Sequence, residues 1–396
     1  MTAPRLDVLC IGNAIVDVIA DADDAFLAAQ SLDKGSMRLI DEDEAVRLYG
    51  VMRPGREISG GSAGNTAAGL ASFGLKAGFI GQVASDELGD IYRHDVESLG
   101  VDFLVPARGD VGATARSLIL VTPDAQRTMN TFLGAAQRLE AKDIDPAKVA
   151  DAAIVYLEGY LWDPAEPRAA MEAAIAAARD AGRKVAFTLS DTFCIDRHRD
   201  GFQALIDAGK IDILFANEAE LKAMTGEAEF DAGLAQLSAK VATLVVTRSE
   251  HGAVAVRGDE RASVPAEPIE KLVDTTGAGD AFSGALVAAL SLFPEHAFSH
   301  AIQYAGRVAA LSTETIGTAP AMPSRAQVSA RFSKVRELVH QRLIFQYYVF
   351  CEVPSLVNQL PQERNKNYAV SSIGGSGNEI VARQKTAPVF DQIFVC

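Results

Sequence analysis

Cysteine is scarce in this sequence, and its few copies are scattered. The 396 residues include four cysteines, namely Cys10, Cys194, Cys351 and Cys396. No two of them have the spacing of a metal-ligand pair, so cysteine spacing predicts no zinc site. Cys10 lies in an apolar run, where we expect it to act as a small buried hydrophobic residue. A reducing compartment is the expected setting.

Basic residues are outnumbered, with 37 Lys and Arg against 52 Asp and Glu and a formal net charge of −15. No basic stripe is present to neutralise phosphates, which argues against nucleic acid or an anionic membrane as a partner. No apolar run is long enough to span a bilayer, and the first residues contain no apolar signal core. We therefore expect a cytoplasmic protein whose partners are small molecules.

Several catalytic patterns are also missing. The sequence has no Gly-x-Ser-x-Gly elbow for hydrolase chemistry and no Gly-x-x-x-x-Gly-Lys-Ser/Thr phosphate loop. His198 and His251 are isolated, and the pair Ser190 and Asp191 has no partner histidine pattern. These absences exclude the common serine hydrolases and the P-loop phosphotransferases.

What the chain does have is a repeated alternation of apolar runs and helical segments. Such runs predict strands at 6–12, 152–157, 184–189, 211–215 and 243–247, and an alanine-rich helix at 167–181. Strands that alternate with helices of about a dozen residues are typical of βαβ units in a doubly wound, mostly parallel sheet. The length allows more than one structural unit.

Two parts of the chain break this rhythm. The runs 37–40, 114–121 and 127–132 have no crossover helix between them, so we expect a small antiparallel sheet beside the main one. It could be a lid over a site or an ordinary edge extension. From about residue 342 the sequence contains a run of aromatic residues and then becomes rich in Gln, Asn, Ser and Gly. This change in composition favours an extension outside the catalytic core.

The most informative segment is 274–282, which reads Asp-Thr-Thr-Gly-Ala-Gly-Asp-Ala-Phe. Gly277, Ala278 and Gly279 carry almost no side chain, so their N–H groups can surround an anion at the start of the helix that follows. Asp280 stands where a base beside a transferring phosphoryl group would lie. A helix cap after a tight turn is the plainer alternative.

Two further glycine-rich stretches precede it. Gly60, Gly61 and Asn65 lie in a turn that opens a predicted helix, and the close backbone approach would suit a sugar diol. The glycine spacing is wrong for a dinucleotide fingerprint, although a simple turn with a cap remains an alternative. Asn13 and Asp17 follow the first strand, where ligands bind in open α/β sheets. Asp17 stands among apolar residues and needs a ligand or a backbone partner.

Asn217 and Glu220 follow a later strand and have the spacing of a capping box. Their alternative role is to organise water around a Mg²⁺ held by nucleotide phosphates. Thr247 and Gly252 follow the next strand and would flank the nucleotide, or would form an ordinary hairpin turn. Arg127, on the expected small sheet, could reach a phosphate.

Taken together, these motifs resemble the ribokinase-like (PfkB) family of sugar and nucleoside kinases, from about Leu6 to Pro323. The resemblance implies an α/β/α sandwich with a small β-sheet lid. It implies a kinase domain over residues 1–335, with lid strands within about 13–20, 35–41 and 101–132. Residues 336–396 would be an atypical extension, and the protein a monomer or homodimer.

Within the family the chain is most similar to adenosine kinases and bacterial relatives described as sugar kinases. The resemblance implies ATP and Mg²⁺, with a monovalent cation such as K⁺ in some relatives, where Asp274 and Thr276 match. Asp280 would be the base and residues 277–279 the anion hole. The remaining residues would bind substrate (Asn13, Asp17, Gly60, Gly61, Asn65, Tyr160, Phe193), bind nucleotide (Arg127, Asn217, Thr247, Gly252, Thr276) or act on Mg²⁺ through water (Glu220).

The expected reaction is phosphorylation of the 5′-hydroxyl of adenosine. A kinase for a free sugar such as ribose or fructose, or for inosine or guanosine, stays open as an alternative. A non-catalytic ligand-binding protein on the same scaffold is a third reading, against which the intact Asp280 motif speaks.

Overall fold

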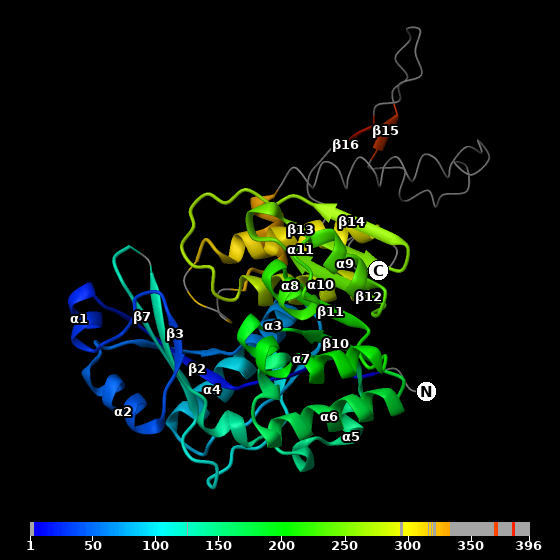
Figure 1. Cartoon of the computed structure of the whole chain (residues 1–396). Helices are drawn as coiled ribbons and strands as arrows, with labels where there is room; N and C mark the ends of the chain where they lie inside the picture. The colour runs from blue at the N-terminus through cyan, green and yellow to red at the C-terminus, as the bar shows by residue number, and fades with distance from the viewer. Residues whose placement is uncertain are drawn as a thin grey trace. The chain divides into compact units, whose positions relative to one another are not determined.

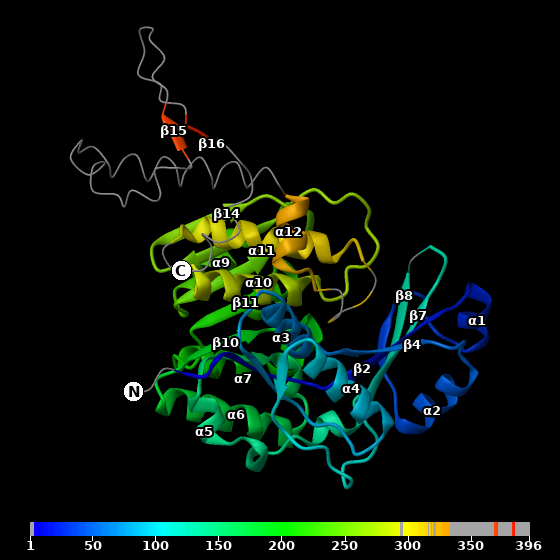
Figure 2. The same cartoon turned by 180° about the vertical axis from the view of Figure 1, so that it is seen from behind.

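A large, mostly parallel sheet organises the chain, as the two opposite views show (Figures 1 and 2). The computed structural model describes residues 4–332, except 125, 294–295, 316, 318 and 320–321, together with 368–370 and 382–384. The strands of the large sheet, in spatial order, are β14 (Glu260–Val264), β13 (Ala253–Arg257), β12 (Thr243–Thr247), β11 (Ile213–Asn217), β10 (Lys184–Thr188), β9 (Ala152–Glu158), β1 (Leu6–Ile11), β5 (Ala77–Ile80) and β6 (Val101–Phe103).

The five strands predicted from apolar runs are all present as β1, β9, β10, β11 and β12, and they pair in parallel. They are buried along nearly their whole length because helices cover both faces of the sheet. Only β13 and β14, at one edge, are antiparallel to their neighbours.

The α-helices flank the strands, and most of them cover the two faces of the large sheet. Their bounds are α1 (Asp24–Ala29), α2 (Glu42–Val51), α3 (Ser62–Ser72), α4 (Glu87–Ser98), α5 (Pro146–Ala150), α6 (Ala165–Asp180), α7 (Thr192–Asp207), α8 (Glu218–Thr225), α9 (Phe230–Ser238), α10 (Ala278–Leu292), α11 (Phe298–Ser312) and α12 (Arg325–Arg331). The chain steps from β1 to β5 in one direction and from β9 to β10 in the other, so right-handed crossovers put α3 and α6 on opposite faces. Helix α10 packs on α3 and α11 packs on α10.

A second sheet has the order β3 (Met37–Leu39), β8 (Arg127–Phe132), β7 (Ala115–Val121), β2 (Ile15–Asp21) and β4 (Arg56–Gly60). We call it the small sheet; Figure 2 shows it beside the large one. The expectation of an antiparallel sheet is wrong for two of its pairings, because β2 pairs with β7 and β3 with β8 in parallel. Between the two strands of each parallel pair, the chain forms β5 and β6 of the large sheet and then enters the small sheet again in the same direction. Strand β4 was missed, and β6, inside the expected lid range 101–132, belongs to the large sheet.

The small sheet is connected to the large one at the point where the glycine-rich stretches lie. Three residues lie between β1 and β2, and one residue lies between β4 and α3. Helices α3 and α10 begin at Ser62 and Ala278, earlier than the starts at Thr66 and Ala281 that the sequence predicts. Asn65 and Asp280 therefore stand inside the first turns of their helices rather than before them.

The chain divides into two units, Met1–Arg331 and Phe332–Cys396. In the second unit the structure describes an antiparallel pair of strands, β15 (Tyr368–Val370) and β16 (Ala382–Gln384). The aromatic run that begins near residue 342 and the last ten residues lie outside the described residues. The kinase-domain boundary near residue 335 stays a prediction.

Candidate active site

Asp280 lies in the first turn of α10 and is held by two side chains from the first turn of α3. Asn65 Nδ2 donates to Asp280 Oδ2 at 2.9 Å, and the Ser62 hydroxyl donates to Oδ1 at 2.7 Å. Burial raises the pKa of Asp280, whereas these two hydrogen bonds lower it in part. The residue keeps part of its surface open. A fixed, partly accessible carboxylate of this kind can accept a proton from a bound hydroxyl.

The glycine turn before Asp280 presents free amides at a helix N-terminus. Gly277 is the N-cap residue of α10 and has φ of 77°, a left-handed conformation that glycine adopts without strain. Of the three expected anion-hole amides, that of Ala278 already donates to the Thr275 carbonyl at 3.2 Å. Within the described part of the chain, the amides of Gly277 and Gly279 donate to no acceptor. Two amides and the helix dipole are thus available to an anion without rearrangement.

The expected substrate residues meet around the turn between β4 and α3. A Cβ at Gly60 would lie 2.4 Å from Asp17 Oδ2, and one at Gly61 would lie 2.2 Å from the Asn13 carbonyl oxygen. Glycine at both positions therefore lets this turn pack directly against the start of β2. Among the residues that the structure describes, Asn65 Oδ1 is buried and has no hydrogen-bond partner, so a ligand hydroxyl could satisfy it. All these residues are brought together, although their contacts to a substrate stay predictions.

Glu158 is a residue that sequence reasoning missed. Glu158 is the last residue of β9, and its side chain is fully buried. The carboxylate accepts hydrogen bonds from the backbone amides of Asn13 and Ala63, at 2.7 Å each. Gly12 leaves room for it, since a Cβ there would lie 2.5 Å from Glu158 Oε2. Burial raises its pKa to about 7, against the amide hydrogen bonds and with a smaller contribution from the Asp280 charge. The sequence signal for this residue was a single carboxylate at the end of an otherwise apolar strand, since such a group needs a partner when it is buried.

Arg127, from the start of β8, forms a buried ion pair with Asp274, from the loop before the glycine turn. Asp274 also accepts the amides of Thr276 at 2.9 Å and Gly317 at 3.1 Å. Arg127 Nη1 is buried and finds no hydrogen-bond partner in the described part of the chain. The arginine thus reaches the loop that leads into Asp280, while its contact with a phosphate stays a prediction. The carboxylate that the resemblance assigned to a monovalent cation pairs here with a guanidinium group.

Asn217 and Glu220 form the capping box of α8. Glu220 accepts the Asn217 backbone amide at 3.0 Å and its side-chain amide at 2.6 Å, while Asn217 accepts the Glu220 amide at 2.8 Å. Burial raises the pKa of Glu220 to about 7. Both carboxylate oxygens accept hydrogen bonds within the capping box, and the action of this pair on Mg²⁺ through water stays a prediction. Thr247 lies beside Asn217 on the next strand.

Gly252 closes the turn between β12 and β13. Its φ is 82°, and a Cβ there would lie 2.0 Å from the Val264 carbonyl oxygen. The position requires glycine for local packing, and a further role beside a nucleotide stays a prediction.

Tyr160 and Phe193 lie on neighbouring segments at the ends of β9 and β10. The Tyr160 hydroxyl donates to the Ser190 carbonyl at 3.3 Å, and Phe193 is 67% exposed. The pKa of Tyr160 lies well above its ordinary value because of burial and the nearby carboxylates of Asp191, Asp280, Glu158 and Glu220.

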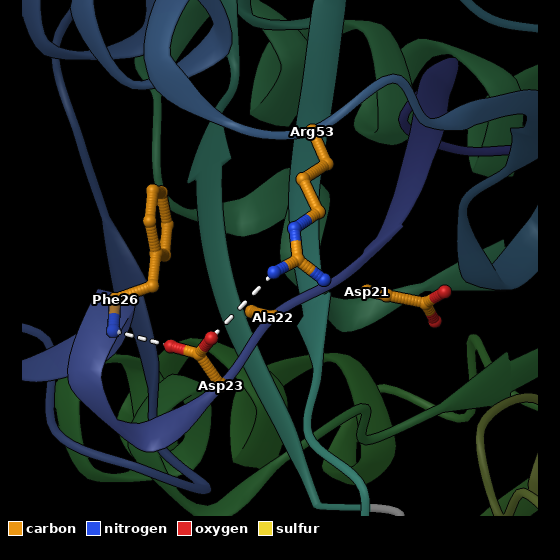
Figure 3. Close-up of a pocket in the computed structure, with 5 residues that line it drawn as sticks. All are labelled: Asp21, Ala22, Asp23, Phe26 and Arg53. Carbon is orange, nitrogen blue, oxygen red and sulfur yellow. Dashed lines mark hydrogen bonds and ion pairs between the residues drawn. The ribbon is translucent and has the colours of Figure 1, made fainter.

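A hollow elsewhere in the molecule is separate from this cluster. Figure 3 shows it at the far end of β2, lined by Asp21, Ala22, Asp23, Phe26 and Arg53. In this hollow Asp23 already accepts the Phe26 amide at 2.8 Å and pairs with Arg53 at 3.5 Å. Over the residues that the structure describes, no cluster of three metal-ligating side chains occurs. None of the described helices has the length and apolar character needed to cross a membrane.

The mostly parallel sheet, the small second sheet and the aspartate beside a glycine turn define a ribokinase-like kinase. The chain belongs to the pfkB family of carbohydrate kinases, whose family model matches residues 5–325. Enzymes of this family transfer a phosphoryl group from ATP to a hydroxyl group.

Three similar proteins differ in the acceptor that their names give. The ATP-dependent ribose-1-phosphate kinase of Halopiger xanaduensis is 31% identical over 285 residues, which cover 72% of this chain and 89% of that protein. The adenosine kinase structure from Sinorhizobium meliloti is 41% identical, with a TM-score of 0.76, and covers 84% of this chain and 99% of its own. A probable sugar kinase structure from Rhizobium etli is 40% identical, with the same TM-score and coverage. Similarity therefore leaves the acceptor open.

Proposed function

We propose that this protein is an ATP-dependent kinase that phosphorylates the 5′-hydroxyl of a nucleoside, with adenosine as the favoured acceptor. The observation that carries the proposal is the Asp280 carboxylate, which Asn65 and Ser62 hold beside the free amides of Gly277 and Gly279. An acceptor hydroxyl next to Asp280 would lose its proton there while a phosphoryl group rests on the amides.

Phosphoryl transfer requires mainly alignment and neutralisation of charge. Asp280 takes the proton as the hydroxyl oxygen attacks the γ-phosphorus of ATP, and ADP leaves. The two amides and the N-terminus of α10 stabilise the charge on the transferring group. Mg²⁺, when bound with the nucleotide, neutralises part of the triphosphate charge, and Asn217 and Glu220 would act on it through water. Closure of the small sheet over the site would exclude water as the acceptor.

The face of the small sheet that carries Asp17 supports a nucleoside over a free sugar. Asp17 is paired with Ser117, Ser117 with Thr131, and Thr131 with Leu39, so these side chains share one face. Leu39 is 56% exposed, and Met37, two residues earlier on the same face, is 45% exposed. An open apolar surface beside a diol-binding carboxylate suits a flat base better than another polar ring.

Product analysis tests the proposal directly. The full-length protein is incubated with ATP, Mg²⁺ and one acceptor, and ³¹P NMR follows the products. With adenosine we expect stoichiometric ADP and AMP, with the new phosphate on the 5′ oxygen. ADP formation with ribose, fructose or ribose 1-phosphate, together with none from adenosine, would assign the protein to the sugar-kinase alternative. Adenosine binding without ADP from any acceptor would favour the non-catalytic reading.

A further inference from the structure

The first turns of α7 are set apart from the rest of that helix. His198 has φ of −130° and ψ of 17°, which are not helical values and mark a kink inside α7. The short segment before the kink, residues 192–197, carries the exposed Phe193. Beside it lies the 3₁₀ helix η3 (Gly159–Trp162), which carries Tyr160. We call residues 192–197 the α7 front segment.

Hydrogen bonds connect η3 and the residue that follows it to the α7 front segment and the loop just before it. At the start, the Tyr160 hydroxyl donates to the Ser190 carbonyl and the Cys194 thiol donates to the Gly159 carbonyl, each at 3.3 Å. At the kink, Asp163 accepts two hydrogen bonds from Arg197, at 2.8 and 2.6 Å.

The same carboxylate contacts His198 Nε2 at 2.6 Å. Asp163 directly follows η3. Its side chain therefore contacts both Arg197 and His198, the two residues at the kink in α7. Burial opposes its ionisation, yet the hydrogen bonds from Arg197 and His198 bring the pKa of Asp163 below its ordinary value. The carboxylate is therefore charged when it holds the kink.

We propose that Asp163 is a positioning residue that holds the α7 front segment against η3, so that Tyr160 and Phe193 form the two walls of a slot for a planar aromatic base. Because Phe193 has little packing of its own, the backbone that carries it must be fixed from elsewhere. Asp163 supplies that anchor without touching the substrate. This inference rests on the proposed nucleoside acceptor and names the segment that would select it.

The chain carries its own optical probe of this segment. Trp162 is the only tryptophan in the sequence, and it directly precedes Asp163. Its ring packs edge-to-face on Phe202, four residues beyond the kink, with centroids 5.6 Å apart. The Arg168 guanidinium lies over the same ring at 5.6 Å. A change in the contact between η3 and α7 should therefore alter the intrinsic fluorescence.

The experiment compares Asp163→Asn and Asp163→Ala with a control, Asp196→Asn, in the full-length protein. Asp196 lies in the same segment, but its side chain is 64% exposed and its partner Arg199 is 3.9 Å away. We expect both Asp163 variants to raise the KM for adenosine roughly tenfold, because the competent conformer becomes a minor one. The KM for ATP and kcat should change less than threefold, and the control should match the wild type.

Hydrogen exchange in the free protein supplies a readout that is independent of activity. In the Asp163 variants, the amides of residues 192–198 should exchange faster, while those of β9 and β10 should keep their wild-type protection. Unchanged exchange in 192–198, or equal rises in the KM values for adenosine and ATP, would overturn the positioning role.

The proposed function is judged separately, in the wild type. There, adenosine should produce a saturable change in Trp162 fluorescence. If it produces none and no ADP forms, the nucleoside proposal fails and the base slot fails with it. A wild-type response that persists unchanged in both Asp163 variants overturns the positioning role alone.

Discussion

The side-chain amide of Asn65 donates to the carboxylate of Asp280 at 2.9 Å, although the two residues are 215 positions apart in the chain. The contact forms because the first turns of α3 and α10 lie together. The close helix packing uses Gly284, where a Cβ would lie 3.1 Å from the Thr66 carbonyl oxygen. This hydrogen bond and that from Ser62 thereby join the loop expected to bind the acceptor to the turn expected to bind the phosphoryl group.

Replacing Asp280 by Asn should leave ligand binding intact and lower turnover by roughly two to four orders of magnitude, the usual contribution of a general base. The amide keeps the shape of the carboxylate but takes no proton from the acceptor. Calorimetry with adenosine and rates of ADP release test the two halves of this prediction. Asp259→Asn, in an exposed turn, is the control. Near-normal turnover of the Asp280 variant would mean that another group is the base.

Glu158→Gln should weaken acceptor binding, because a side-chain NH₂ group would face one of the two backbone amides that Glu158 now accepts. We expect the KM for the acceptor to rise while the KM for ATP stays near its wild-type value. A variant with unchanged values for both would show that the two loops hold their positions without this carboxylate.

The same residue predicts a pH dependence. The folded pKa of Glu158 is raised to about 7 from an ordinary 4.5, so between these values the folded state holds a proton that the unfolded state has lost. The contribution of Glu158 to stability therefore decreases as pH rises from 4.5 to 7 and is constant above that range. Urea unfolding across this range should show a steeper decrease in the wild type than in Glu158→Gln, because the similarly raised pKa of Glu220 contributes equally to both proteins.

Breaking the ion pair of Arg127 and Asp274 should be costly because both side chains are largely buried, at 11% and 0% exposure. Removing one partner of such a pair destabilises a protein by about 3–5 kcal/mol. Urea unfolding of Arg127→Gln, Asp274→Asn and the double variant should give a double-variant loss well below the sum of the single losses.

Kinetics separate the role of Arg127 toward phosphate from this structural role. If Arg127 also serves the phosphate, its variant should lose more kcat/KM for ATP than Asp274→Asn does. Equal kinetic losses would limit Arg127 to holding the small sheet against the loop that contains Asp274.

A protein that ends after residue 335 should keep kcat and both KM values. The family match ends at residue 325, and two solved relatives are matched over 99% of their own length while covering 84% of this chain. Steady-state kinetics and thermal unfolding of the full-length and shortened proteins test this. A large loss of activity would show that residues after 335 contribute to the catalytic unit.

The features written in contiguous sequence were predictable. Apolar runs such as 152–157 locate strands, and the glycine turn before Asp280 identifies its helix start. The pairing directions of the small sheet depend on how the chain returns to it after forming strands of the large sheet. No local sequence pattern encodes that path. The role of Glu158 was not predicted, because a carboxylate at the end of a strand is common. Its two backbone amide partners are distant in sequence and become known only from the structure. The amide of Ala278 likewise looked free until its bond to Thr275 was seen.

The most direct measurement of the central claim is kcat/KM for ATP-dependent ADP release across a panel of adenosine, inosine, guanosine, ribose, fructose and ribose 1-phosphate. A nucleoside kinase with Asp280 as its base should favour adenosine by at least about tenfold over each free sugar, and Asp280→Asn should remove the activity with every acceptor. A preference for a free sugar, or activity that survives the loss of Asp280, would contradict it.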